Sequence, residues 1–552
     1  MRKSARAVSA VLLWVLSASF PLSALAADTC KEPAGRLASI EGQVQVQTGA
    51  QPGWQPAKPE QVLCRGDSIR VGKSGRAAVV LANEAVMRLD QNTTIRLLEI
   101  SGRKEDRSFV ELVKGALQSF SRKPRLMSVN TPYLNGSIEG TEFEVRVDGE
   151  QSSILVLEGR VVAANERGSV ALKPGDQAAT RAGDAPTVRT LVKPRDSVQW
   201  SLHYPQILAA GGAANAPLER AAQLLAVGRQ DEALPELDAA LAREPQSGLA
   251  YALRAVVHVV RNERSLALEA AEKGVALSDT PATRIALSYA QQADFRIEAA
   301  RDTLLAAVER SPDDALAWAR LSELQLMLGD KERARRSAGK ATTLAPDLAH
   351  AQRVLGFASL SEYRGDAAGA AFRRAIELDP SDPMARLGLG LAHISRGELQ
   401  AGRAELELAV ALDPNQALLR AYLGKAYFEE RRDTLDDQQF DIAKSLDPLD
   451  PTAFLYDGIR KQTANRPIDA LTDLETSAAL NDQRAVYRSR LLLDKDQAAR
   501  GTSVARVYND LGFPDLGAVE ASRSLALDQL PDRHHRRHDL RIQVGKREFF
   551  FR

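Results

Sequence analysis

A 34-residue period in the second half of this 552-residue sequence constrains its fold more than any other feature. Proline recurs at that interval, and alanine recurs in the same register five residues earlier. The prolines are Pro312, Pro346, Pro380, Pro414 and Pro448, and the alanines are Ala307, Ala341, Ala375, Ala409 and Ala443. Chance does not explain both series, so we expect similar structural units stacked one on the next.

Inside each unit, small residues recur at two positions and large apolar residues at a third. With proline counted as position 32, position 8 holds Ser288, Ser322, Gly356, Gly390, Gly424 and Gly458, position 20 holds Ala300, Ala334, Ala368, Gly402, Asp436 and Ala470, and position 24 holds Leu304, Phe372, Leu406, Phe440 and Leu474. Small residues let two antiparallel helices approach closely, and the residue at position 24 fills the volume between them. The pattern resembles the tetratricopeptide repeat (TPR), which implies an α-helical solenoid of helix-turn-helix units.

The units differ in how closely they keep this pattern. The clear ones run 281–314, 315–348, 349–382, 383–416 and 417–450, and weaker ones run 214–247, 248–281 and 451–484. We therefore expect TPR repeats over 214–484. About fourteen extra residues follow, so we interpret 485–530 as an irregular segment with a last TPR-like unit near 498–531.

Residues 35–192 follow a different pattern, in which short alternating or β-branched runs are separated by Gly, Asn and Asp turns. The segments GQVQV, GDSIRVGKSGRAAVVL, VKGALQSF, VNTPYLNGSIEGTEFEVRV, ILVLEGRVV and ALKPGDQA occur in this order. Their succession resembles the periplasmic domain of the FecR family and implies an all-β domain. Its most specific element combines Thr131-Pro132 with Gly140-Thr141-Glu142-Phe143, which in the family marks a turn leading into a buried strand.

The chain departs from the family pattern before this domain. A full FecR regulator resembles a cytoplasmic anti-sigma segment joined to the domain through a membrane helix. Here the first 26 residues have the order of an export signal: basic residues, an apolar run and a small-residue site. They are Arg2, Lys3 and Arg6, then Val8 to Phe20, then Ala24-Leu25-Ala26. We expect cleavage after Ala26, the alternative being an uncleaved anchor, and we do not carry over the sigma-signalling role.

Two consequences of export follow for the mature chain. Cys30 and Cys64 are the only cysteines, and an even pair in an oxidising compartment suggests one disulfide, with two free thiols as the alternative. The chain should lie in the periplasm or cell envelope, with no transmembrane helix after signal cleavage.

A net charge of +1, from 73 basic and 72 acidic residues, gives no reason to expect nucleic acid as a partner.

The connector at 193–213 separates the two patterns. It contains Trp200 and Tyr204, which we expect to dock the β domain against the helices, and it ends in a Gly/Ala/Asn hinge. Similar FecR-plus-TPR chains have a Trp-x-x-x-Tyr-Pro connector of this kind.

The first helix of each repeat lines a concave groove in the TPR family, and here its groove positions are mostly apolar. The candidate partner-binding residues are Leu326, Phe357, Leu360, Leu387, Leu391, Ile394, Phe428, Leu455 and Ile459. No Lys and Asn arrangement for clamping a carboxylate is present, so we predict recognition of a helix or apolar segment of a partner. The alternative is that neighbouring repeats or the C-terminal region cover this apolar strip.

No motif for catalysis or for a cofactor stands out. There is no nucleophile elbow or zinc signature, and His203, His258, His350 and His393 are isolated in sequence. We therefore expect a protein that is not an enzyme and that needs no metal or cofactor.

Residues 531–552 fit no repeat and form a basic tail, which we interpret as disordered or aberrant. His534, His535 and His538 lie in it, but flanking arginines oppose a metal ion. The end of the chain is also consistent with a truncated or frameshifted form of a longer envelope protein.

These observations favour a periplasmic or cell-envelope scaffold that binds protein partners through its TPR groove. The alternative is an envelope sensing or signalling protein whose FecR-like domain contacts an outer-membrane transporter or a cell-wall component.

Overall fold

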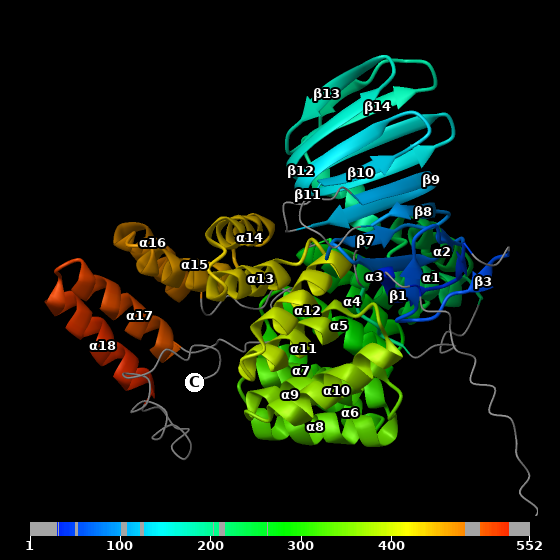
Figure 1. Ribbon diagram of the computed structural model, residues 1–552. Coiled ribbons are helices and arrows are strands. Elements are labelled where there is room, and N and C mark those ends of the chain that lie inside the picture. The colour runs from blue at the N-terminus through cyan, green and yellow to red at the C-terminus, as the bar shows by residue number, and fades with distance from the viewer. Residues whose placement is uncertain are drawn as a thin grey trace, which may run out of the picture.

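The computed structural model describes two parts, a strand-rich part followed by a series of helices (Figure 1). The predicted fold class is thereby confirmed. The described residues are 30, 33–49, 53–100, 108–121, 126–201, 204–208, 216–261, 263–480 and 497–528. The expected export signal at 1–26 and the basic tail at 531–552 lie outside them.

The N-terminal part is built from short strands and three long ones. The strands are β1 (Pro33–Glu41), β2 (Val44–Gln47), β3 (Gln55–Pro56), β4 (Val62–Cys64), β5 (Ser68–Val71), β6 (Arg76–Leu81), β7 (Val86–Leu89), β8 (Thr94–Glu99), β9 (Ser108–Phe120), β10 (Leu126–Asn130), β11 (Asn135–Asp148), β12 (Gln151–Asn165), β13 (Gly168–Leu172), β14 (Asp176–Arg181) and β15 (Thr187–Thr190). A short 3-10 helix, η1 (Pro194–Ser201), follows.

The long strand β11 connects the strands before it, β9 and β10, to the strand after it, β12. Strand β11 pairs with β12 along most of its length, while its beginning pairs with β10 and its end with β9. The register shifts around Glu142, within the segment that most resembles the FecR family. A shift of this kind bends a strand and increases its twist, so the sheet rolls around one apolar core.

The helices follow the 34-residue period. They are α1 (Ala216–Ala226), α2 (Gln230–Arg243), α3 (Gly248–Val260), α4 (Arg264–Leu277), α5 (Pro281–Ala293), α6 (Ile297–Arg310), α7 (Ala315–Met327), α8 (Lys331–Leu344), α9 (Ala349–Ser361), α10 (Gly365–Leu378), α11 (Pro383–Ser395), α12 (Leu399–Leu412), α13 (Ala417–Glu429), α14 (Asp433–Leu446), α15 (Pro451–Thr463), α16 (Pro467–Ala479), α17 (Gln497–Asp510) and α18 (Pro514–Asp528). Within the described ranges, no helix combines the length and the apolar character needed to cross a membrane.

In the units with glycine at position 8, the small and large positions meet as their spacing predicts. A Cβ added to Gly424 would lie 2.9 Å from the ring of Phe440, and one added to Gly458 would lie 2.8 Å from Leu474. Both partners are buried. A glycine at position 8 therefore provides the space that the side chain at position 24 occupies.

The helices wind into a solenoid that holds the sheet on its inner side. In Figure 1, β1 and β7 lie against the helices, while β12, β13 and β14 project away from them. Strand β7 contacts α12 directly. The last helices, α14 to α18, extend sideways from the solenoid, to the left in Figure 1.

Candidate functional site

An arginine on the first helix of four successive repeats points into the solenoid. We name this set the arginine row: Arg320 of α7, Arg353 of α9, Arg386 of α11 and Arg420 of α13. All four are buried. A buried guanidinium needs a charge partner and several acceptors, so each member has to be matched by specific neighbours.

The first two members are matched inside the solenoid. Arg320 lies 2.9 Å from Glu323, and Arg353 lies 2.9 Å from Glu323 and 2.5 Å from Asp382. His350 adds a contact of 2.8 Å to Glu323. Although burial opposes ionisation, His350, Arg353 and Arg320 hold the pKa of Glu323 well below its usual value.

The last two members are matched partly by the sheet. Arg386 donates to the backbone oxygen of Ala38 at 3.2 Å. Arg420 donates through Nη2 to both carboxylate oxygens of Glu142, at 3.0 and 2.8 Å. Neither the Arg420 nor the Glu142 side chain retains any exposure. Residues 278 positions apart thus form a fully buried ion pair between the two domains.

Apolar side chains surround this contact. Ala38, Ala78, Val86 and Phe120 of the sheet belong to one apolar cluster with residues of α7 to α13. The Arg420 guanidinium carbon lies 5.5 Å from the centre of the Phe120 ring. We name this contact area, Arg386 and Arg420 together with these four sheet residues, the domain interface.

The first repeats contact the sheet as well. Arg76 of β6 donates to the backbone oxygens of Trp200 and Ala226, at 3.0 and 3.3 Å. Arg229, just before α2, forms an ion pair with Asp90. The solenoid therefore contacts the sheet near its beginning and again at α11 to α13.

The connector joins the two domains as expected. Trp200 contacts Glu144 of β11 through its indole nitrogen at 3.4 Å, and Tyr204 donates to Gln230 of α2 at 2.7 Å. Both aromatic side chains are buried. One ring therefore contacts the sheet and the other the first repeat.

The predicted partner-binding residues lie mostly inside the molecule. Seven are buried, namely Leu326, Phe357, Leu360, Leu387, Leu391, Ile394 and Leu455. Phe428 and Ile459 are half-buried. Six of the seven buried residues share the apolar cluster that includes the four sheet residues, and Leu455 packs with Val504 and Val507. The strip is therefore filled by neighbouring repeats, by the N-terminal domain and, at Leu455, by α17 in the C-terminal region, and in this arrangement most of it is closed to a partner.

The arginine row was not anticipated from the sequence, although a signal for it exists. Its members follow one another at intervals of 33, 33 and 34 residues, close to the period of the prolines. A charged residue that recurs with a structural period indicates a shared buried role.

Two of the expectations about single residues can be compared with the structure. His258, His350 and His393 each contact one glutamate, Glu263, Glu323 and Glu398 respectively. His203 lies outside the described residues. Cys30 and Cys64 are joined by a disulfide, with an S–S distance of 2.06 Å.

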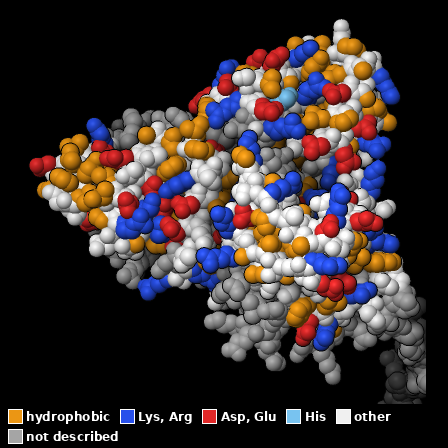
Figure 2. Space-filling view, turned by 90° about the horizontal axis from the view of Figure 1, so that it is seen from above, with side chains coloured by type: hydrophobic (Ala, Val, Ile, Leu, Met, Phe, Trp, Pro, Cys, Tyr) orange, Lys and Arg blue, Asp and Glu red, His pale blue; other side chains and the backbone are white. Residues whose placement is uncertain are grey.

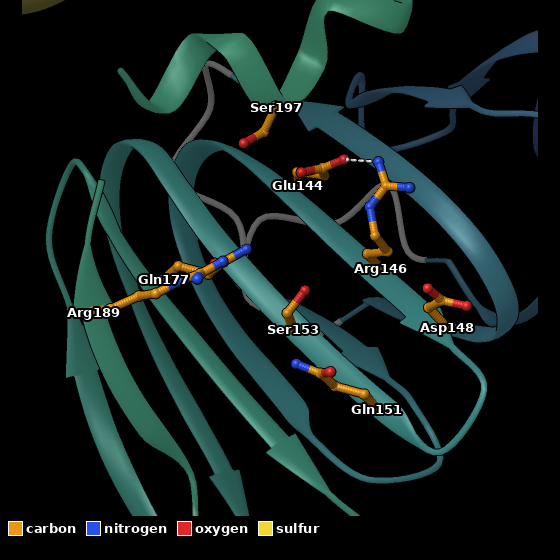
Figure 3. Close-up of a pocket in the computed structure, with 8 residues that line it drawn as sticks. All are labelled: Glu144, Arg146, Asp148, Gln151, Ser153, Gln177, Arg189 and Ser197. Carbon is orange, nitrogen blue, oxygen red and sulfur yellow. Dashed lines mark hydrogen bonds and ion pairs between the residues drawn. The ribbon is translucent and has the colours of Figure 1, made fainter. Parts of the chain in front are cut away.

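A polar hollow of about 320 Å³ opens on the part of the sheet that projects from the solenoid (Figure 3). It is lined by Glu144, Arg146 and Asp148 of β11, Gln151 and Ser153 of β12, Gln177 of β14, Arg189 of β15 and Ser197 of η1. Arg146 lies 2.6 Å from Glu144, and Arg189 donates to Gln177 at 2.7 Å. Burial raises the pKa of Glu144, while Arg146 and Trp200 oppose that rise. The lining contains two guanidinium groups, of Arg146 and Arg189, and two carboxyl groups, of Glu144 and Asp148.

Comparisons with known families agree with both halves of the chain. The family described as "FecR protein" matches residues 67–162, and the family described as "Tetratricopeptide repeat" matches 283–349 and 360–417. The chain therefore combines a FecR domain with tetratricopeptide repeats. A search of curated proteins found no match.

Solved structures resemble the helical architecture. The APC/C hetero-tetramer Cut9-Hcn1 is 19% identical with a TM-score of 0.47, over 58% of this chain and 62% of that chain. A tetratricopeptide repeat protein from Parabacteroides merdae ATCC 43184 is 14% identical with a TM-score of 0.33, over 44% of this chain and 99% of that chain. YrrB, described as a TPR protein with an unusual peptide-binding site, is 20% identical with a TM-score of 0.24, over 33% of this chain and 95% of that chain. These likenesses concern the fold alone.

Proposed function

We propose that this chain is an exported protein-interaction scaffold of the cell envelope, with no enzymatic role, in which the FecR domain and the solenoid act as one unit. The buried contact between Arg420 and Glu142 carries this proposal, because it joins the two domains far from the connector. Both domain types are associated with protein interaction or signalling. The basic and apolar N-terminal segment supports periplasmic export.

The partner surface lies at the end of the predicted strip that the sheet leaves open. Phe428 on α13 and Ile459 on α15 keep part of their side chains exposed, and Lys425 lies 5.3 Å from the Phe428 ring. An apolar surface of this kind suits the apolar face of a partner helix. The partner is a protein, and it binds without displacing the FecR domain.

Cross-linking in the producing cells tests this surface. In the chain carrying Phe428→Glu and Ile459→Glu, capture of the partner should fall to background, because a charge in an apolar contact costs its desolvation. Leu305→Glu is the matched control, since Leu305 is 38% exposed on α6 of an earlier repeat. Unchanged capture by the double variant, with helicity intact by circular dichroism, would contradict this surface.

A second function is favoured by the polar hollow on the projecting part of the sheet. A signalling protein would use this face to contact an outer-membrane transporter or cell-wall component, and Arg189 in the hollow has no ion-pair partner among the described residues. Arg189→Glu should then abolish copurification of a transporter while leaving capture at Phe428 unaffected. If partner capture is lost in the Phe428→Glu and Ile459→Glu chain but not in the Arg189→Glu chain, the result supports the scaffold over the signalling alternative.

A further inference from the structure

The last helix pair departs from the earlier repeats at positions that face outward. Position 16 is charged in the six preceding units, with Arg296, Asp330, Arg364, Glu398, Arg432 and Arg466, but it is Phe513 in the last unit. Position 22 is small or polar in those units, with Asp302, Arg336, Ala370, Ala404, Gln438 and Thr472, but it is Val519 in the last unit. The change is confined to the described end of the solenoid.

These apolar residues are exposed in the chain on its own. Phe513 is 53% exposed, Leu516 is 48% exposed and Val519 is 49% exposed. Ile468 on α16, at a position that carries an acidic or polar residue in the five clear units, is 71% exposed. Figure 2 shows hydrophobic side chains gathered at the left-hand end of the molecule, where the last helices lie. Exposed apolar residues at positions that are mostly charged or polar in the other repeats indicate a surface that another molecule covers.

The charges on α18 identify the covering molecule. Asp515, Val519 and Arg523 are spaced four residues apart, so they lie along one side of the helix. Two copies of this helix packed antiparallel, with Val519 opposite Val519, place the Asp515 of each copy opposite the Arg523 of the other. The surface is thus complementary to itself, which is the requirement for a twofold interface.

We propose that a second copy of this chain packs against α18, in an antiparallel pair whose twofold axis passes beside Val519. Leu516 on α18 and Phe513 just before it extend the apolar contact toward the N-terminal end of each helix. Arg523 lies 2.6 Å from Glu520 of its own helix, whereas Asp515 has no ion-pair partner among the described residues. A single helix pair makes a small interface, so the dimer dissociates in the micromolar range.

Charge reversal tests the pairing in the full chain, with sedimentation equilibrium as the measurement. Asp515→Arg alone and Arg523→Asp alone should each raise the dissociation constant at least about tenfold, because like charges then face each other. The chain with both substitutions should dimerise as the original does. An equimolar mixture of the two single variants should form a mixed dimer. Lys340→Asp, an exposed residue on α8, should leave dimerisation unchanged.

Two results would overturn the proposal. The first is an original chain that stays monomeric at concentrations of about 100 µM, well above the expected dissociation constant. The second is a dimer that tolerates Val519→Glu or that is not restored by the double charge reversal. Because none of these substitutions touches the domain interface, failure here leaves the proposed scaffold function standing.

Discussion

Arg420 and Glu142 form the contact on which the relation between the two domains depends most. Burying two charges costs solvation, and the pair offsets that cost only while both partners are present. Glu142 belongs to the Gly140-Thr141-Glu142-Phe143 segment that carries the resemblance to the FecR family. A residue that sequence reasoning assigned to a turn and a buried strand is therefore also the partner of the solenoid.

Removing one charge of this pair should destabilise the chain strongly. Arg420→Met leaves a buried carboxylate with weaker partners, so the free energy of unfolding should fall by about 3 to 5 kcal/mol in a denaturant titration. Adding Glu142→Gln should recover part of the loss. Arg374→Met is the control, because Arg374 forms an exposed ion pair with Asp347. An Arg420→Met chain as stable as this control would show that the pair is not buried.

Asp379 predicts a dependence of stability on pH. Burial, and then the neighbouring carboxylate of Asp382, raises the pKa of Asp379 from 3.8 to about 6. The folded state therefore holds this proton more tightly, and the free energy of unfolding should fall as pH rises through the window between those two values. Asp379→Asn removes this loss while keeping an acceptor for Ser381. Its stability relative to the original should rise by roughly 1 to 3 kcal/mol between pH 4 and pH 7 in parallel denaturant titrations, and an unchanged difference would contradict the raised pKa.

At the scale of the helices, glycines determine how closely neighbouring units pack. A Cβ added to Gly388 on α11 would lie 2.1 Å from the ring of Phe372 on α10, and one added to Gly356 on α9 would lie 2.6 Å from the same ring. Phe372 is fully buried between these helices. One ring therefore sets the spacing of three helices.

Gly388→Ala should lower the free energy of unfolding by about 1 to 3 kcal/mol, because the added methyl group overpacks the contact with Phe372. Combining it with Phe372→Leu should cost less than the two changes added together. Gly339→Ala on α8 is a control with the opposite sign, since no atom lies within 4 Å of the added Cβ and alanine favours the helix. Thermal unfolding of the four variants measures both effects, and additive losses would argue against the close packing.

The repeat pattern predicted the helices well because it reports what all units share. Small residues at position 8 and large ones at position 24 are local requirements, and they recur wherever a helix pair forms. The occupant of the concave side could not be predicted in the same way. Contacts such as Arg386 with Ala38 join residues 348 positions apart and differ from one repeat to the next. No period in the sequence reports them.

At the scale of the whole molecule, the groove expected to bind a partner is largely an internal interface, because most of its apolar residues are buried. Leu387 and Leu391 are fully buried, so their apolar character serves the packing of the chain itself. Among the described residues, the surfaces proposed for other molecules are the open end at Phe428 and Ile459, the polar hollow and the outer face of α18. The FecR domain therefore determines which part of the groove stays open in the proposed scaffold.

Photo-crosslinking inside the full chain tests this arrangement most directly. Glu84 of the sheet lies 3.9 Å from Arg403 on α12 and is partly exposed, so a photoreactive amino acid in its place reports on the domain interface. Glu166, on the hairpin between β12 and β13 that projects from the solenoid, is the control position. We predict that irradiation of the monomer links position 84, and not position 166, to peptides from 399–412. Crosslinks from position 84 that reach only the sheet or another protein would show that the FecR domain does not fill the solenoid.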